Sequence, residues 1–195
     1  MAGQDIRKAG SHNVGAMNTH GLIKAKTRSE KRAALGLVIV VLGDMAKGIL
    51  AVHLTHWLGY LGYSPLPAVT VASFFVILGH NYPICFRFRE GGIGFASLLG
   101  ILAALGPDAI AVWSGTMLFC IFWGDYILSR KRNVHDLSSA ISVIGNHIPG
   151  RLVGMGAALA MVYFLNARLL FPILGPTILI LIKHYIRREQ LKNTP

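Results

Sequence analysis

The chain has 195 residues, of which 53% are hydrophobic and only 14% are charged, and its formal net charge is +11. This composition is too apolar for a soluble domain, so it predicts a single integral-membrane domain over residues 1–195. Nucleic-acid binding is not indicated, because the basic residues flank apolar stretches and form no stripe with interleaved aromatic side chains. We expect the positive charge to face the anionic headgroups of a lipid bilayer.

The apolar stretches, taken in chain order, predict an all-α, polytopic membrane helical bundle with about six transmembrane spans. The predicted spans are Ala33–Leu58, Leu66–Phe86, Gly94–Leu105, Asp108–Leu128, Leu137–Leu165 and Leu169–Arg187. The third is led by a glycine and is only about 18 Å long at 1.5 Å per residue, so it is thin, tilted or partly spanning. The fifth is interrupted at Asn146–Arg151, where Pro149 and Gly150 favour a break or a kink.

The positions of the basic residues predict how the spans are oriented. The N-terminal segment, the gaps at 87–93 and 129–136 and the tail hold 16 of the 19 Lys and Arg residues, whereas the alternate gaps hold only Arg168. By the positive-inside rule, both termini are then cytoplasmic. We expect residues 1–32 to form a basic cytoplasmic loop region and residues 33–187 to form the transmembrane core, in the cell membrane.

The first polar segment on this basic side is Gly10–Asn18, in which hydroxyl, imidazole and amide groups lie close together. Gly10 and Gly15 permit tight turns that aim backbone N–H groups at an anion. Serine, asparagine and glycine are also common in loops that bind nothing, so this segment alone favours the simpler interpretation of a loop.

The second polar feature is an acidic and a basic residue inside the first span, Asp44 and Lys47. Three residues apart on a helix, the two side chains share a face and neutralise each other. A buried ion pair contributes little stability after its desolvation is counted, so a purely structural role is the weaker explanation. The pair therefore indicates a functional site in which Lys47 binds a phosphate or a carboxylate.

The third polar feature joins the second and third spans. His80 lies at the end of one span, and a glycine-rich turn from Phe88 to Gly94 opens the next. A glycine-rich loop that leads into a helix N-terminus is suited to anions, because free N–H groups and the helix dipole point the same way. The turn is not a Walker motif, since no Gly-Lys-Ser/Thr follows its glycines.

Together these segments resemble the PlsY family, the membrane acyl-phosphate:glycerol-3-phosphate acyltransferases. The family has an early G-S-x-N-P-G-A-T-N stretch, and Gly10–Asn18 reads GSHNVGAMN. Its membrane-embedded D-x-x-K-G is matched by Asp44, Lys47 and Gly48. Its G-H-x-(F/Y)-P and F-(K/R)-G-G-K-G-x-A-(T/S) motifs correspond to GHNYP at Gly79–Pro83 and FREGGIGFAS at Phe88–Ser97.

The chain departs from the family pattern at several positions. The family Pro and Thr of the first motif are Val14 and Met17, and Gly21 stands where an Arg is expected. The glycine-rich loop gains Glu90, and its second basic residue is Ile93. Family members carry a further helix before the first loop, for seven spans in all, so the resemblance predicts that this chain lacks the first of them.

The C-terminal family motif R-H-R-x-N-I allows two registers in this chain. In one, His184 keeps the role of the family histidine; in the other, Arg187 and Gln190 replace the family His and Asn. The losses at these motifs remove cationic and amide groups from the expected phosphate site.

The resemblance implies acyl transfer from an acyl phosphate to the 1-hydroxyl of glycerol 3-phosphate, which makes lysophosphatidic acid for phospholipid biosynthesis without a cofactor or a metal. The residues that it assigns to catalysis are Ser11, Lys47 and His80. His80 is a candidate proton acceptor, although a substrate phosphate is an equally open choice. The residues that it assigns to substrate binding are Gly10, His12, Asn13, Gly15, Asn18, Asp44, Gly48, Gly79, Arg89, Gly91, Gly92, Gly94, His184, Arg187 and Gln190.

Two alternatives remain open at this stage. The first is the same fold with a lost activity or a changed acceptor, suggested by Ile93, Gly21 and the altered tail. The second is a small transporter or channel subunit that uses Asp44, Lys47 and His80 as an ion path. Neither the acyl chain preference nor the oligomeric state follows from the sequence.

Overall fold

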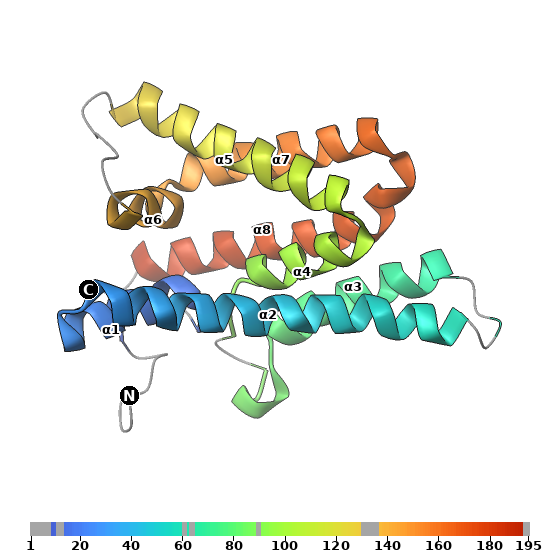
Figure 1. Ribbon diagram of the computed structural model, residues 1–195, viewed down its shortest axis with the longest axis horizontal. Helices are drawn as coiled ribbons and strands as arrows, with labels where there is room; N and C mark the ends of the chain where they lie inside the picture. The colour runs from blue at the N-terminus through green and yellow to red at the C-terminus, as the bar shows by residue number, and fades with distance from the viewer. Residues whose placement is uncertain are drawn as a thin grey trace. The chain divides into compact units, whose positions relative to one another are not determined.

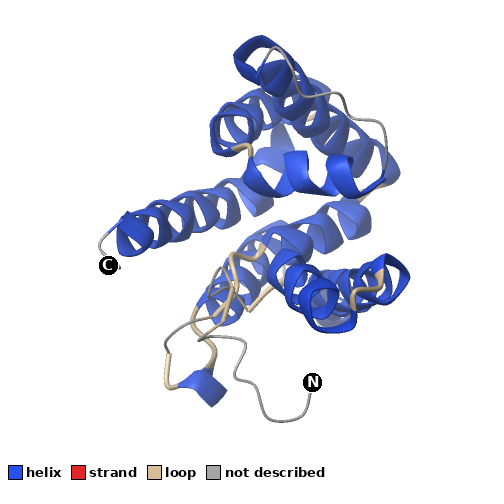
Figure 2. Cartoon of the chain, turned by 90° about the vertical axis from the view of Figure 1, so that its left-hand side faces the viewer, coloured by secondary structure: helices blue, strands red, loops and turns tan. Residues whose placement is uncertain are grey.

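The computed structural model describes residues 9–10, 14–59, 62, 65–88, 91–129 and 137–192, without the side chains of 129, 137–138, 145–146, 187–188 and 190–192. Every regular element within these residues is a helix, and loops connect the helices (Figures 1 and 2). The chain divides into two compact units. Unit 1 comprises Met1–Ala104 and Pro172–Pro195, and unit 2 comprises Leu105–Phe171.

The apolar helices confirm a polytopic membrane bundle. The helical stretches long and apolar enough to cross a bilayer are Glu30–Gly59, Pro65–Phe86, Pro107–Leu128, Ile148–Leu165 and Ala167–Ile186. Phe95–Leu105 is apolar but shorter, as the glycine-led third span predicts. Its 11 residues extend about 17 Å, roughly half of a 30 Å hydrocarbon core.

Unit 1 contains most of the helices of the chain. They are α1 (Ala16–Thr27), α2 (Glu30–Gly59), α3 (Pro65–Asn81), the short 3₁₀ helix η2 (Ile84–Phe86), α4 (Phe95–Leu105) and the greater part of α8 (Leu170–Lys192). Figure 1 shows α2 and α3 side by side. α1 occupies part of the N-terminal region that we expected to be a loop.

α1 packs against the first turns of α2. Glu30, the first residue of α2, accepts from Lys24 Nζ at 2.7 Å and contacts His20 Nε2 at 3.0 Å. Further along, Gly36 gives room to the Ile23 side chain, which occupies the space that a Cβ atom would need. Ion pairs and a close apolar contact thus fix the basic α1 to a membrane helix.

The faces of α2 divide sharply between exposed apolar and buried small or polar residues. Leu35, Leu50 and Leu54 have exposed fractions of 61%, 68% and 57%. The buried stripe is formed by Asp44, Gly48, Val52 and Thr55, which recur every three or four residues. Exposed leucines on a long apolar helix suit contact with lipid, whereas the buried Asp44 and Thr55 face the protein.

α2 and α4 approach each other closely through two glycines. A Cβ at Gly48 would lie 2.7 Å from Ile101 N and would also collide with Ser97 O. A Cβ at Gly100 would collide with the backbone of Met45. Small residues at such a contact let the backbones of membrane helices pack directly, and here they bring the short α4 against the polar part of α2.

Unit 2 is built on the antiparallel contact of two long helices. It contains α5 (Pro107–Ser129), α6 (Leu137–Asn146), α7 (Ile148–Leu165) and η3 (Ala167–Leu169). Gly154 of α7 gives room to Met117, and Gly150 lies against the backbone of Ile121. The helix break expected near Pro149 is confirmed at His147, whose Nδ1 accepts from Gly150 N at 3.0 Å.

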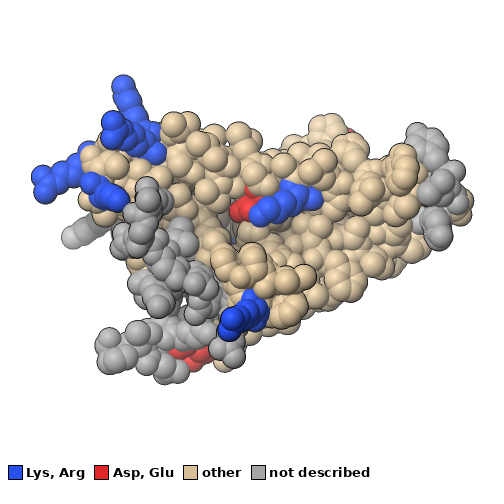
Figure 3. All heavy atoms as spheres, turned by 90° about the horizontal axis from the view of Figure 1, so that it is seen from below, with Lys and Arg blue, Asp and Glu red and all other residues tan. Residues whose placement is uncertain are grey.

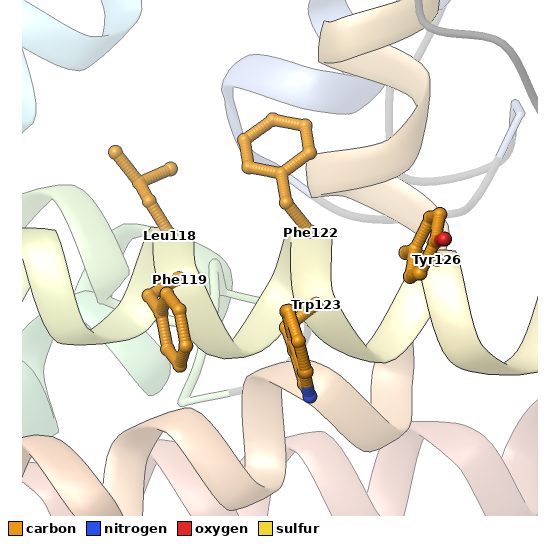
Figure 4. A pocket seen from close by; sticks show the side chains of 5 residues that line it. All are labelled: Leu118, Phe119, Phe122, Trp123 and Tyr126. Atoms are coloured by element: carbon orange, nitrogen blue, oxygen red, sulfur yellow. The ribbon is translucent and has the colours of Figure 1, made fainter.

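One face of α5 carries an open apolar groove lined by Leu118, Phe119, Phe122, Trp123 and Tyr126. Figure 4 shows Leu118 and Phe122 on one side of the helix and Phe119 and Trp123 on the other. The rings of Phe119 and Trp123 stack with their centroids 5.7 Å apart. The described lining residues carry no charge, so the groove suits apolar chains better than a phosphate.

Candidate functional site

The centre of the site is the ion pair on α2. Lys47 Nζ lies 2.7 Å from Asp44 Oδ1, one turn away on the same helix. The Asp44 side chain is 11% exposed, whereas that of Lys47 is 59% exposed. The carboxylate is therefore fixed inside the protein, and the ammonium group extends outward, where an anion can reach it.

His80, near the end of α3, contacts the same carboxylate. Its Nδ1 lies 3.5 Å from Asp44 Oδ1, and its side chain is only 8% exposed. Asp44 thus faces an ammonium group of its own helix and an imidazole of the next one. When His80 is neutral with its proton on Nδ1, that N–H points toward Asp44 and the lone pair resides on Nε2.

The glycine-rich loop packs directly on His80. A Cβ at Gly92 would collide with His80 Nε2 and would lie 2.8 Å from Val14 O. A Cβ at Gly91 would collide with the carbonyl oxygens of His80 and Asn81. Both positions are buried and have no room for a side chain. The loop backbone therefore lies in direct contact with His80.

Gly94 turns the loop into α4. Its φ of +93° is one that residues with a side chain rarely adopt. Leu98 N donates to Gly94 O at 3.0 Å, and α4 begins at Phe95. The loop therefore ends at a helix N-terminus, where backbone N–H groups and the helix dipole favour an anion.

The N-terminal segment contributes backbone to the same place. Val14 O contacts the Gly92 position, and Gly15 caps α1, its carbonyl accepting from Thr19 N at 3.0 Å. Asn18 is buried and donates to Ala9 O at 3.0 Å, and its side chain fills the space above Gly10. Ser11, His12, Asn13 and Arg89 lie outside the described residues.

Other residues of the sequence prediction lie elsewhere or are only partly described. Gly79 faces open space, and Gly48 lies in the contact between α2 and α4. His184 is buried on α8. Arg187 and Gln190 belong to the last turns of α8, but their side chains are outside the described part of the chain.

The sequence analysis did not single out two polar residues that the structure places at this site. Asn81, which follows His80, is fully buried. Lys183 of α8 is also buried, and its Nζ donates to Asn81 O at 3.0 Å. No sequence pattern pairs these residues, although a lysine inside an apolar span is itself a signal of a buried polar site.

Basic groups of α1 and of the first turn of α2 lie toward one end of the face drawn in Figure 3. The exposed ones are Lys24, Lys26, Arg28, Lys31 and Arg32. Away from that end, Lys and Arg atoms are sparse on this face (Figure 3). Lys47 lies apart from this cluster in the chain, and the buried Asp44 carboxylate keeps it in place.

Comparison with known proteins gives one family for this chain. The glycerol-3-phosphate acyltransferase family model matches residues 1–193. A glycerol-3-phosphate acyltransferase of Pseudomonas paraeruginosa is 32% identical over 82% of this chain and 76% of its own length. One of a Wolbachia from Brugia malayi is 30% identical over 95% of this chain and 80% of its own length.

Another similar protein aligns over a shorter stretch. A glycerol-3-phosphate acyltransferase of Hydrogenovibrio crunogenus is 39% identical, and the alignment spans 59% of this chain and about half, 48%, of that relative. No solved structure gives a significant match to the chain.

Proposed function

The chain belongs to the PlsY family of glycerol-3-phosphate acyltransferases, and on that premise we propose that it acylates the 1-hydroxyl of glycerol 3-phosphate. Transfer of an acyl group from an acyl phosphate to glycerol 3-phosphate, for phospholipid biosynthesis, is the function of the family. The observation that carries the proposal for this chain is the contact of Lys47, Asp44 and His80 beside the glycine-rich loop.

In the proposed reaction, Lys47 binds phosphate charge. Its ammonium group is exposed and is held by Asp44 at 2.7 Å, so a phosphate that approaches from the open side completes its hydrogen bonds. The loop from Gly91 to Gly94 adds backbone N–H groups at the start of α4. Neither contribution needs a metal ion or a protein nucleophile.

The proposed chemical step is a direct acyl transfer. The 1-hydroxyl oxygen of glycerol 3-phosphate forms a bond to the acyl carbon, and the bond from that carbon to the phosphate oxygen breaks, which releases inorganic phosphate. The hydroxyl proton passes to His80 Nε2 or to a substrate phosphate. Contact of His80 Nδ1 with Asp44 supports the first choice, because with the proton on Nδ1 the lone pair that accepts a proton is on Nε2.

Family resemblance extends this proposal to residues outside the described part of the chain. Ser11 and Asn13 would orient the glycerol hydroxyls or the acyl carbonyl, and Arg89 would add a second cation. Val14 O lies against the glycine loop, which supports a place for the neighbouring Asn13 at the same site.

A direct test measures lysophosphatidic acid and phosphate released by the purified chain from acyl phosphate and glycerol 3-phosphate. We expect turnover by the unmodified protein, with kcat/KM reduced about 10- to 100-fold by Lys47→Met, because one charge-assisted contact to phosphate is lost. Lys31→Met removes an exposed lysine from the same helix and serves as the matched control. Absence of both product formation and substrate binding in the unmodified protein would refute the proposal.

A second candidate is a changed acceptor on the same fold. Ile93 replaces a family basic residue inside the glycine loop, which lowers the positive charge available to a phosphate. Ile93→Lys, assayed with several phosphorylated acceptors, separates the two candidates. If the unmodified chain already acylates glycerol 3-phosphate at ordinary enzymatic rates, the changed-acceptor candidate is eliminated.

The apolar helices make the chain a multi-pass membrane protein. We propose that it lies in the cell membrane with both ends of the given chain in the cytoplasm, which would expose Lys47 and the glycine loop to cytosolic substrates. Reporter proteins fused after Pro195 and before Met1 test this orientation. Periplasmic activity of either fusion would contradict it.

A further inference from the structure

The C-terminal end of α3, which carries His80, contacts a lysine of α8. Lys183, on the part of α8 that belongs to unit 1, is 8% exposed and donates through Nζ to Asn81 O at 3.0 Å. The same ammonium group lies 4.2 Å from the centre of the Tyr82 ring. A buried cation is costly in an apolar helical protein, so these contacts compensate its desolvation.

Asn81 joins this lysine to the glycine-rich loop. Three backbone oxygens surround one end of its side-chain amide, so we assign the NH₂ group to that end. The opposite orientation would give a single, longer bond from the amide nitrogen to Leu179 O at 3.4 Å. In the assigned orientation the two amide N–H groups face Ile93 O at 2.9 Å and Gly92 O at 3.2 Å, and the nitrogen also lies 3.2 Å from Ile77 O. The residue is fully buried, so water does not compete for these bonds.

Holding these two carbonyl groups also fixes the direction of the N–H groups that follow them. In a planar trans peptide the C=O and the next N–H point in opposite directions. Because Gly92 O and Ile93 O are turned toward Asn81, the N–H groups of Ile93 and Gly94 are turned away from it. The buried network thus decides which way the backbone donors of the glycine loop face.

We infer that Asn81 and Lys183 are positioning residues for acyl transfer, acting through the glycine loop and His80 rather than on the substrates. Lys183 holds the main chain of Asn81, and the Asn81 amide holds the peptide groups that orient the N–H groups of Ile93 and Gly94. The inference rests on the proposed function for its kinetic consequence, but the network itself is independent of that function.

The first experiment follows backbone hydrogen exchange in the full-length protein. Lys183→Met keeps the length of the side chain and removes its charge and donors. We expect amide exchange of residues 91–95 to accelerate about tenfold, since a buried charge-assisted hydrogen bond is lost, while exchange in α5 and α7 is unchanged. Lys31→Met, an exposed lysine on α2, is the matched control and leaves residues 91–95 unaffected.

Two further variants keep the test decisive if Lys183→Met folds poorly. Asn81→Asp replaces the NH₂ group by an oxygen that repels Gly92 O and Ile93 O, so it accelerates exchange in the same segment. Lys183→Arg retains a charged donor and restores slow exchange. Unchanged exchange of residues 91–95 in both Lys183→Met and Asn81→Asp would overturn the inference.

The kinetic arm separates positioning from simple destabilisation. Misdirected N–H groups weaken phosphate binding, so we expect Lys183→Met to raise the KM for glycerol 3-phosphate or for acyl phosphate about tenfold. A variant that is merely less stable lowers the active fraction and kcat without a change in KM, and that result argues against positioning. If the unmodified protein shows no turnover, the proposed function is refuted. The exchange data still decide whether Lys183 and Asn81 hold the glycine loop in place.

Discussion

His80 Nδ1 lies 3.5 Å from Asp44 Oδ1, the same oxygen that Lys47 Nζ contacts at 2.7 Å. One carboxylate oxygen therefore holds two cation-forming groups that come from successive membrane helices. Because Asp44 is buried and Lys47 is exposed, the carboxylate is the fixed partner and the ammonium group the accessible one. This arrangement gives Asp44 an orienting role toward both neighbours.

Asp44→Asn tests that role. The amide has the size of the carboxylate but no charge, so Lys47 and His80 both lose the group that orients them. We expect kcat/KM to fall by about 10-fold or more, within the range for a misplaced proton acceptor. Steady-state phosphate release measures the effect, and circular dichroism confirms that the helices persist. A rate equal to that of the unmodified protein would show that Asp44 orients neither group.

Gly92→Ala tests the close packing of the glycine loop on His80. The added methyl group would collide with His80 Nε2 and lie 2.8 Å from Val14 O, so the ring or the loop has to move. We expect at least a tenfold loss of turnover, because displacements near 1 Å at a reacting centre have effects of this size or larger. Gly156→Ala in α7 is the control, since its methyl group also meets nothing within 4 Å and Gly156 belongs to no proposed site. Equal rates for the two variants would contradict this packing argument.

Gly48→Ala tests the contact between α2 and α4. Its methyl group would lie 2.7 Å from Ile101 N, a backbone atom that cannot move aside alone. We expect a loss of about 1–3 kcal/mol in stability, the usual effect of overpacking, seen as a lower Tm in detergent. Gly43→Ala lies on the same helix with nothing within 4 Å, so it leaves Tm unchanged or slightly raised. The reverse order of the two melting temperatures would disprove the close contact.

Glu30→Gln tests how α1 is attached to α2. The substitution removes the negative partner of Lys24 at 2.7 Å and of His20 at 3.0 Å. The Glu30 side chain is 37% exposed and solvent screens its contacts, so we expect a modest effect, roughly two- to threefold faster exchange of the α1 amides. High salt should reproduce part of this change in the unmodified protein. Exchange that is insensitive to both treatments would mean that apolar packing alone holds α1.

The membrane helices were predictable because a long apolar segment in a bilayer has to pair its backbone N–H and C=O groups internally, which a helix does. The short third span and the break before Pro149 followed from segment length and from proline chemistry, and the structure has α4 at Phe95–Leu105 and a break at His147. α1 was not predicted, since it is polar and has no apolar periodicity. Its buried residues, Asn18, Thr19 and His20, acquire their environment only from packing against other segments.

The candidate site was predictable in part. The spacing of Asp44 and Lys47 implied their ion pair, and the glycine-rich turn implied a close backbone approach. The contacts of His80 with Asp44 and of Lys183 with Asn81 join separate helices, and the second spans 102 positions of the chain. Side-chain chemistry indicates that a buried lysine needs a partner, but without a structure it does not say which carbonyl supplies it.

The length of α2 has a consequence for the choice of host membrane. Its 30 residues extend about 45 Å, which exceeds a hydrocarbon layer of about 30 Å, so the helix leans or its ends enter the headgroup zone. Asp44 lies near the middle of α2. Its depth in the bilayer therefore depends on the tilt of the helix. Lipids with longer tails would place Lys47 deeper in the bilayer, and lipids with shorter tails would bring it nearer to water. Bilayer thickness would therefore control how easily a charged, water-soluble molecule reaches Lys47.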